Sequence, residues 1–174
     1  MLIGLISDTH GRLHESAYAA LADCDAIIHA GDIGGPSILR ELETLAPVYA
    51  VLGNNDYSEY GSTVRRYAKP VIDGVRFLVA HYPNDVRIGK IRNSALAPGE
   101  PVPHVCVHGH THLPRLDFGS AASPAQFVIN PGSASRPRGG YARSVGKMEV
   151  EAGRILSIRI EMLSGTPLLE WPVA

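Results

Sequence analysis

The stretch LIGLISDTH, residues 2–10, decides the fold. Its first five residues, Leu2 to Ile6, form a nearly all-apolar run, as expected of a β-strand that is covered on both faces. Polar residues, Ser7 to His10, follow this run without a spacer. Such a strand predicts an open α/β sheet, in which ligands bind at the carboxyl ends of the strands.

Four further apolar segments end in the same way. They cover residues 25–30, 48–52, 75–79 and 105–107. The polar residues that follow them are Asp32, Asn54 to Asp56, His81 and His108 to His112. Because carboxyl ends of strands lie along one edge of such a sheet, we expect these groups to converge. The glycines before Asp32, Asn54 and His110 permit turns and a close approach of backbone to a ligand.

Two segments with the residue spacing of a helix separate the first three expected strands. Apolar residues between Leu13 and Leu21 recur at this spacing, and Pro36 is placed to begin a second helix that ends before Pro47. The resulting order βαβαβ predicts a mostly parallel sheet with right-handed crossovers.

Turn signals dominate the second half of the chain. Asp73-Gly74 between apolar strands predicts a β-hairpin, and Ala152-Gly153 predicts another. Apolar and polar residues alternate from Leu156 to Met162, so one face of that strand is expected to be buried. A helix is expected from Asn84 to Ala97. From these signals we expect the second half to be antiparallel.

Length and charge exclude several classes of protein. The chain has 174 residues, and we expect one domain over residues 1–174. Its 16 Lys and Arg residues are balanced by 17 Asp and Glu residues, which gives no excess of positive charge for nucleic acid or a membrane surface. No apolar run reaches the length of a membrane span. The two cysteines, Cys24 and Cys106, fit buried thiols in the reducing cytoplasm.

Histidine is unusually frequent, with 8 residues in a chain that is only 6% aromatic. Two pairs, Asp8 with His10 and His110 with His112, stand at spacing i and i+2, so in extended backbone each pair points the same way. Mixed imidazole, carboxylate and amide ligands suit Mn, Fe, Co, Ni or Zn. The candidate ligands are Asp8, His10, Asp32, Asn54, His81, His110 and His112.

Seven candidates exceed what one tetrahedral ion needs. Two ions that share one carboxylate account for them better. Two divalent ions bring about +4, two aspartates bring −2 and a bridging hydroxide −1, so the site keeps about +1 and would attract an anionic phosphoryl group.

The order of these motifs resembles the calcineurin-like metallophosphoesterase superfamily. The motifs are Asp8-x-His10, Gly31-Asp32, Gly53-Asn54, His81 and Gly109-His110-x-His112. The short length and the run from Ile129 to Ser133 resemble its small prokaryotic phosphodiesterase subfamily. The resemblance extends from residue 1 to about residue 163.

The resemblance implies an αββα sandwich, in which two mixed sheets are flanked by helices. It also implies that Asp8, His10 and His112 hold the first ion, that Asp32 bridges, and that the second ion is held by Asn54, His81 and His110. A metal-bridging hydroxide would then attack phosphorus in line. The expected activity is metal-dependent hydrolysis of small phosphate esters, with phosphodiesters favoured and manganese among the candidate metals.

One position departs from the family pattern. Many members carry a histidine after the motif asparagine, and it is taken to protonate the leaving group, whereas this chain has Asn55. An amide cannot act as a general acid, so we expect slow turnover of esters with poor leaving groups. Asn55 remains a candidate for substrate contact. His108 is a candidate substitute for the acid, or lies outside the site. The residue after His81 is Tyr82, where the family often has glycine.

Other polar residues near the motifs have alternative explanations. Asp56 could hydrogen-bond a ligand imidazole, and His29 fits a satisfied histidine of the core. Arg136 and Arg138 are placed either to clamp a substrate phosphate or to be solvated.

Two rival functions remain open. A non-catalytic protein-interaction scaffold on the same fold is favoured only by the missing proton donor, since a scaffold tolerates lost ligands and all seven are present. A nuclease would need a basic groove, which the net charge of −1 does not support. The tail from Leu163 to Ala174 is a candidate surface for a homo-oligomer.

Overall fold

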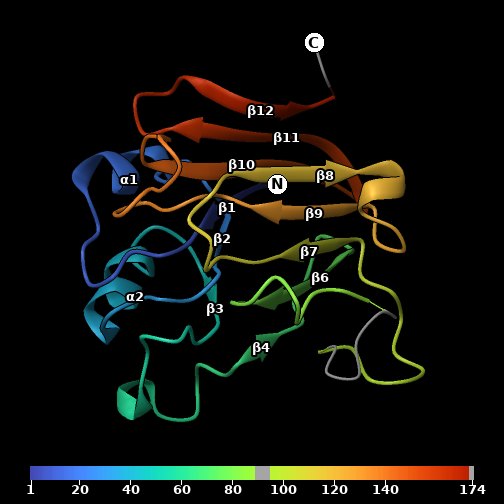
Figure 1. Ribbon diagram of the computed structural model, residues 1–174, viewed down its shortest axis with the longest axis horizontal. Helices are drawn as coiled ribbons and strands as arrows, with labels where there is room; N and C mark the ends of the chain where they lie inside the picture. The colour runs from blue at the N-terminus through green and yellow to red at the C-terminus, as the bar shows by residue number, and fades with distance from the viewer. Residues whose placement is uncertain (89–94, 173–174) are drawn as a thin grey trace.

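Two mixed β-sheets form the fold (Figure 1). The computed structural model describes residues 1–88 and 95–172. The first sheet has the order β12-β11-β10-β1-β2-β3, with β1 Leu2–Ile6, β2 Ala26–His29, β3 Val48–Ala50, β10 Ser144–Glu151, β11 Arg154–Met162 and β12 Pro167–Trp171. The second has the order β4-β6-β7-β9-β8, and β5 pairs with β6; its strands are β4 Tyr67–Ala68, β5 Val71–Ile72, β6 Val75–Ala80, β7 Val105–Val107, β8 Arg115–Phe118 and β9 Phe127–Asn130. The predicted α/β class with two mixed sheets is confirmed.

The main core lies between the two sheets. In β1, Ile3 and Leu5 are fully buried and pack in the same cluster as Phe77 of β6 and Ile129 of β9. The alternate residue Ile6 is also buried, but it packs toward the helices. This period of two explains why β1 is apolar on both faces, as its sequence predicts.

Helices cover the outer face of the first sheet. They are α1 Glu15–Ala20 and α2 Pro36–Leu42, and their buried residues pack against Ile6 and Ile27. Figure 1 shows both helices beside β1, β2 and β3. Pro36 occupies the first turn of α2, as expected.

Turns cover the outer face of the second sheet in the described part of the chain. Val86 and Ala125 pack there on Leu78 of β6 and Cys106 of β7. The helix expected from Asn84 to Ala97 is wrong for its described ends, since residues 84–88 and 95–97 form turns and bends, and residues 89–94 lie outside the described chain.

The second half of the chain is not simply antiparallel. The expected hairpins are present, with β5 antiparallel to β6 and β10 antiparallel to β11. However, β6 pairs parallel with β7, and β7 pairs parallel with β9. The parallel partners bring the ends of β6 and β7 to the same edge, which places His81 beside the loop that follows β7.

The two predicted hairpin turns meet. Asp73 and Ala152, the first turn residues, both have positive φ, of 47°. The backbone N–H of Ala152 donates to Oδ2 of Asp73 at 2.9 Å, and that of Gly153 donates to the Asp73 carbonyl at 2.7 Å. One turn of each sheet therefore holds the other at this end of the sandwich.

The candidate oligomer surface contains an edge strand. Within the tail from Leu163, residues Pro167–Trp171 form β12, at the edge of the first sheet. Residues 173 and 174 lie outside the described chain. No helix in the described residues is both long and apolar enough to cross a membrane.

Candidate metal centre

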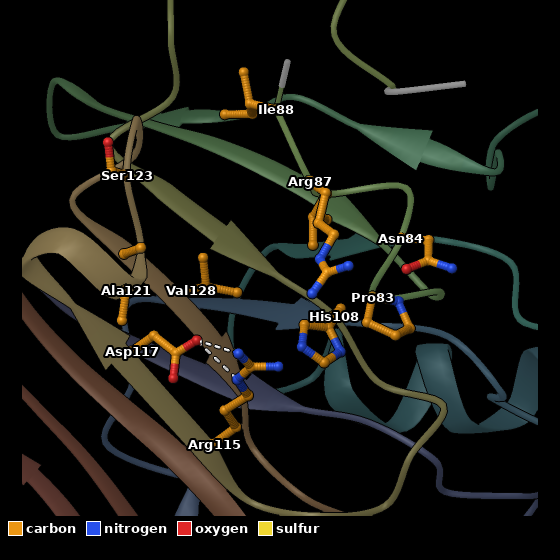
Figure 2. Close-up of a pocket in the computed structure, with 12 residues that line it drawn as sticks. Pro83, Asn84, Arg87, Ile88, His108, Arg115, Asp117, Ala121, Ser123 and Val128 are labelled. Carbon is orange, nitrogen blue, oxygen red and sulfur yellow. Dashed lines mark hydrogen bonds and ion pairs between the residues drawn. The ribbon is translucent and has the colours of Figure 1, made fainter. Parts of the chain in front are cut away.

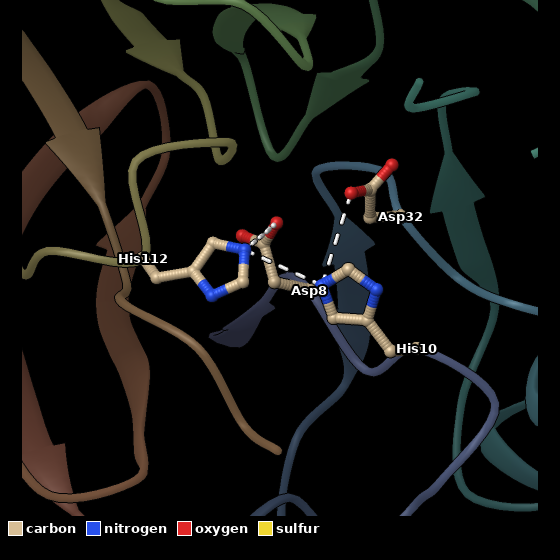
Figure 3. Close-up of side chains that lie close together, drawn as sticks. All are labelled: Asp8, His10, Asp32 and His112. Carbon is tan, nitrogen blue, oxygen red and sulfur yellow. Dashed lines mark hydrogen bonds and ion pairs between the residues drawn. The ribbon is translucent and has the colours of Figure 1, made fainter. Parts of the chain in front are cut away.

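The loops after β1, β2, β3, β6 and β7 bring all seven candidate ligands together at the carboxyl edge. Four of them form a first group, in which one ligand atom of each residue lies within 4.8 Å of the others: Asp8, His10, Asp32 and His112. Figure 3 shows the two imidazoles and two carboxylates turned toward a common point. Nε2 of His112 lies 3.3 Å from Nε2 of His10 and 3.2 Å from Oδ1 of Asp8.

The other three candidates form a second group. The amide oxygen Oδ1 of Asn54 lies 3.1 Å from Nε2 of His81 and 2.9 Å from Nδ1 of His110. The rings of His81 and His110 meet edge to face, with centroids 5.2 Å apart. Tyr82 stacks at their side, its ring centroid 4.6 Å from that of His110.

Asp32 stands between the two groups. Its Oδ2 lies 3.8 Å from Nε2 of His10, and its Oδ1 lies 3.5 Å from Nε2 of His81. Asn55 holds this carboxylate through two donors, its backbone N–H to Oδ1 at 2.8 Å and its side-chain amide to Oδ2 at 2.6 Å. Each oxygen of Asp32 therefore faces one group of ligand atoms.

Backbone carbonyls orient two of the imidazoles. Nδ1 of His81 donates to the carbonyl oxygen of Ala30 at 2.8 Å, and Nδ1 of His112 donates to that of Arg136. A neutral imidazole that donates from Nδ1 carries its lone pair on Nε2, which in both residues faces the cluster. This arrangement is common for histidine ligands of metals, because it fixes the tautomer and the ring.

Oδ1 of Asp8 tests whether the first group fits a metal ion. This oxygen is buried and has no hydrogen-bond partner among the described residues. In the neutral form of His112, Nε2 presents a lone pair 3.2 Å from this oxygen, so that two electron-rich atoms face one another. A cation between them satisfies both. The donor set of two imidazoles and two carboxylates suits a divalent transition metal.

The charges at the site favour cation binding over protonation for two histidines. Burial lowers the pKa of His10, and the nearby Asp32 and Asp8 only partly offset it. Burial and the neighbouring His81 lower the pKa of His110. Both imidazoles are therefore neutral at pH 7, as metal ligands must be.

Asp8 and His112 differ from His10 and His110, because each of the two stabilises the charged form of the other. Burial alone would raise the pKa of Asp8, but His112 and the Ser7 hydroxyl outweigh it, so this pKa is lowered. The Asp8 carboxylate in turn raises the pKa of His112. A proton and a metal cation would therefore compete for Nε2 of His112.

Five of the seven candidate ligands have left-handed backbone conformations. Their φ angles are 55° for Asp8, 47° for His10, 53° for Asp32, 67° for His110 and 61° for His112. Asp and His enter this region more readily than most residues, but each non-glycine residue there still costs on the order of 1 kcal/mol or more. Strain of this kind clusters at functional sites, because it turns side chains that would otherwise point apart toward one point.

Two glycines let these loops approach closely. A Cβ at Gly53 would overlap the carboxylate and backbone nitrogen of Asp32. A Cβ at Gly109 would overlap the Ser7 hydroxyl and lie 2.8 Å from Oδ2 of Asp8. A side chain at either position would therefore push apart the loops that carry Asp8 and Asp32.

Several supporting residues escape prediction from the sequence. Ser133 and Ser135 both donate to the carbonyl oxygen of Asp8, at 2.8 and 2.9 Å, and so fix a strained turn. Ser7 donates to Oδ2 of Asp8 at 2.7 Å. Serine in a loop carries no signal of such a partner; only the position of Ser133 in the run from Ile129 offers a hint.

Asp56 holds three chain segments together instead of contacting an imidazole. It accepts hydrogen bonds from the backbone N–H of Ile33, Gly34 and Gly53 at 2.8–3.0 Å, and from the hydroxyl of Tyr60 at 2.9 Å. Burial alone would raise the pKa of Asp56, but these donors lower it overall. The proposed bond to a ligand imidazole is therefore wrong.

His29 is a satisfied core histidine, as interpreted from the sequence. It is fully buried, its Nε2 lies 2.9 Å from the Thr9 hydroxyl, and its Nδ1 accepts from the N–H of Gly31 at 3.2 Å. Burial lowers its pKa to about 4, so the ring is neutral.

His108 lies apart from the two groups. The residue is 1% exposed and lines a cavity that none of the seven candidate ligands lines.

Two exposed arginines, Arg136 and Arg138, add positive charge near the site. Burial is the main cause of the lowered pKa values of His10 and His110, and Arg136 lowers the first and Arg138 the second further.

The chain is similar in sequence to known phosphoesterases. A family model described as a calcineurin-like phosphoesterase superfamily domain matches residues 1–153. A curated protein of Methanothermobacter thermautotrophicus, named a probable metallophosphoesterase, is 38% identical over 147 residues, which cover 79% of this chain and 80% of the relative.

Solved structures share the fold at lower identity. YfcE, a phosphoesterase from E. coli, is 21% identical with a TM-score of 0.70, and the match covers 100% of both chains. Vps29 from Entamoeba histolytica in complex with Zn²⁺ is 20% identical with a TM-score of 0.70, and the match covers 97% of this chain and 96% of Vps29.

Proposed function

The chain belongs to the calcineurin-like phosphoesterase superfamily, and from this membership and its candidate site we propose that it is a phosphodiesterase that uses two divalent transition-metal ions. The observation that carries the proposal is the position of Asp32, whose two oxygens face two separate groups of ligand atoms. A single ion would leave one of these groups unused.

The proposed ligand assignment follows the two groups. Asp8, His10 and His112 would hold the first ion, and Asp32 would be shared by both ions. The remaining candidates, Asn54, His81 and His110, would hold the second ion. Mn, Fe, Co, Ni and Zn all suit this mixture of nitrogen and oxygen donors, and manganese is included in our proposal on that basis.

The bound ions would supply a hydroxide nucleophile and neutralise the charge that develops on phosphorus during an in-line displacement. The chain itself contributes orientation and further charge. Asn55 fixes the bridging carboxylate through two hydrogen bonds. Arg136 and Arg138, both exposed and close enough to lower the pKa values of His10 and His110, would bind the non-reacting phosphate oxygens.

Leaving-group chemistry supports activated diesters as substrates. The Asn55 amide is committed to Asp32 and cannot donate a proton to a leaving oxygen. The other candidate acid, His108, is buried outside the cluster, where burial lowers its pKa to about 4. The reaction would therefore favour esters whose alcohols leave without protonation.

The two free, buried cysteines support a cytoplasmic location.

A protein-interaction scaffold is the second candidate function. Vps29, whose name denotes a sorting protein, has the same fold, and one Vps29 structure contains Zn²⁺. Metal binding alone therefore does not distinguish the two functions, whereas hydrolysis of a phosphate ester does.

The deciding experiment is hydrolysis of bis(4-nitrophenyl) phosphate and 4-nitrophenyl phosphate after exchange into Mn²⁺, Co²⁺, Ni²⁺ or Zn²⁺. We expect turnover of the diester with at least one metal, and slower turnover of the monoester. No hydrolysis with any of these metals by a folded protein would refute the phosphodiesterase and leave the scaffold.

A further inference from the structure

A cavity lies on the outer face of the second sheet, near the loop after β7 (Figure 2). Its volume is about 260 Å³, slightly below the range typical of small-molecule sites, roughly 300–1,000 Å³, so only a very small ligand would fit. None of the seven candidate metal ligands lines it. Its walls include Val86, Ile88 and Val128, so a small carbon skeleton would meet apolar side chains.

An unsatisfied nitrogen belongs to this cavity. Nδ1 of His108 lies 3.0 Å from the carbonyl oxygen of Gly109, which can only accept a hydrogen bond. The amide nitrogen of Asn130 lies 3.4 Å from the same Nδ1, but its two hydrogens are donated at 2.9 Å to Gly109 and to the Thr111 hydroxyl. Nδ1 therefore carries the hydrogen and Nε2 carries the lone pair. Nε2 is buried and has no hydrogen-bond partner among the described residues. A buried acceptor without a partner is costly, and here it calls for a hydroxyl or N–H donor from a bound molecule.

Two arginines supply the complementary charge. Arg115 uses Nε and Nη2 to bind Oδ2 of Asp117, which leaves its Nη1 outside that ion pair. Arg87 is exposed and has no ion-pair partner in the described chain. Figure 2 shows both guanidinium groups turned toward His108. With Asp117 and a neutral His108, these side chains sum to a charge of +1.

We propose that this cavity binds a small hydroxycarboxylate. Arg87 pairs with the carboxylate, for which a planar guanidinium is the best-matched partner, and the hydroxyl donates to Nε2 of His108. The charge of +1 matches a carboxylate monoanion better than a phosphomonoester dianion. The apolar walls enclose the short carbon chain. This site is independent of the phosphoesterase activity proposed above, because it shares no side chain with the metal centre.

Three small molecules of similar size separate the two contacts. L-lactate carries both the carboxylate and the hydroxyl, propionate lacks the hydroxyl, and propane-1,2-diol lacks the carboxylate. Each is titrated into the full-length ¹⁵N-labelled protein loaded with Zn²⁺, and backbone amide shifts are followed. We expect lactate to shift the amides of His108, Asp117 and Val128 with a Kd in the millimolar range, and the other two molecules to bind at least about tenfold more weakly.

Variants of exposed arginines complete the test. Arg87→Gln should weaken lactate binding by about tenfold, whereas Arg40→Gln, at the exposed end of α2, should leave it unchanged. Because His108 is buried, its contact is tested by comparing lactate with propionate, so no core substitution is needed. Equal binding of lactate and propionate, unchanged binding by Arg87→Gln, or shifts confined to Asp32 and Asn54 would overturn the proposal.

Discussion

Left-handed backbone occurs at both ends of the sandwich, for different reasons. At the hairpin end, Asp73-Gly74 and Ala152-Gly153 have positive φ at both turn residues, as tight two-residue hairpins require. At the carboxyl edge, five candidate ligands have positive φ, although none of them closes a two-residue hairpin. In the turns this conformation closes a pair of antiparallel strands. At the edge it directs the ligand atoms of several side chains toward one another.

The contacts around the left-handed residues stabilise the fold at the hairpin end, whereas at the carboxyl edge they leave atoms free for a ligand. Turn residues at the hairpin end hydrogen-bond each other directly, as Ala152 does with Asp73. At the edge, Oδ1 of Asp8 remains without a hydrogen-bond partner among the described residues, and electron-rich atoms face one another. A buried carboxylate oxygen without a partner among the described residues, on a strained loop, indicates that a ligand completes this edge.

The largest expected effect is at Asp32. Asp32→Asn removes the charge shared by the two proposed ions, so hydrolysis of bis(4-nitrophenyl) phosphate should fall by at least about 10³-fold, which corresponds to roughly 4 kcal/mol of transition-state stabilisation. Asp23→Asn, an exposed carboxylate paired with Lys147, is the matched control and should keep full activity. If Asp32→Asn retained more than a tenth of the activity, the proposal that two ions share the Asp32 carboxylate would be wrong.

Asp56 tests the support beneath the strained edge. Asp56→Ala leaves four donors without their acceptor and should lower the free energy of unfolding by about 3 kcal/mol at pH 7, measured by urea denaturation. Because the folded pKa is lowered, the stability from this carboxylate is present above its unfolded pKa of about 3.9 and is lost as pH falls through the folded value.

The difference between wild type and Asp56→Ala should therefore shrink when the same titration is repeated at pH 3. A difference that stayed constant from pH 7 to pH 3 would assign the effect to packing. Asp23→Ala, which removes only an exposed ion pair, should change the stability by less than about 1 kcal/mol.

Asn55 tests orientation without removing a ligand. Asn55→Ala frees the Asp32 carboxylate from its side-chain donor, and we expect a 10- to 100-fold loss of activity, as is typical when partners of metal ligands are removed. The metal content, measured by elemental analysis, should stay at the wild-type value. Loss of metal together with activity would show that Asn55 is needed for binding, and unchanged activity would show that its hydrogen bond is incidental.

Ala152→Gly gives the smallest effect and concerns the hairpin end alone. Glycine adopts the φ of 47° without steric cost, so the free energy of unfolding should rise by about 0.5–1 kcal/mol with no change in activity. A loss of stability would mean that the left-handed residue in this turn is not strained.

The sequence predicts what depends on local pattern. The apolar runs before Asp8 and Asp32 place strands correctly, and Asp73-Gly74 places its hairpin. The parallel pairing of β6, β7 and β9 was missed because it is set by contacts between distant segments, which no local signal records. The strands β4, β8, β9 and β12 were not predicted either: β4 has only two residues, two of the four residues of β8 are charged, and β12 begins with proline.

The candidate site divides in the same way. Its seven ligand candidates follow from residue type and strand ends, and the structure brings all of them to one edge. Their hydrogen-bond partners do not follow, because Ala30 and Arg136 contribute only carbonyl oxygens, which every residue has. The role of Asp56 does not follow either, because three of its four donors are backbone N–H groups, two of them in another loop.

Anomalous diffraction from crystals of the Mn²⁺-loaded protein tests the central claim most directly. The account predicts two peaks per chain, roughly 3.5–4 Å apart, on either side of the Asp32 carboxylate. A single peak, or peaks away from Asp32, would contradict it.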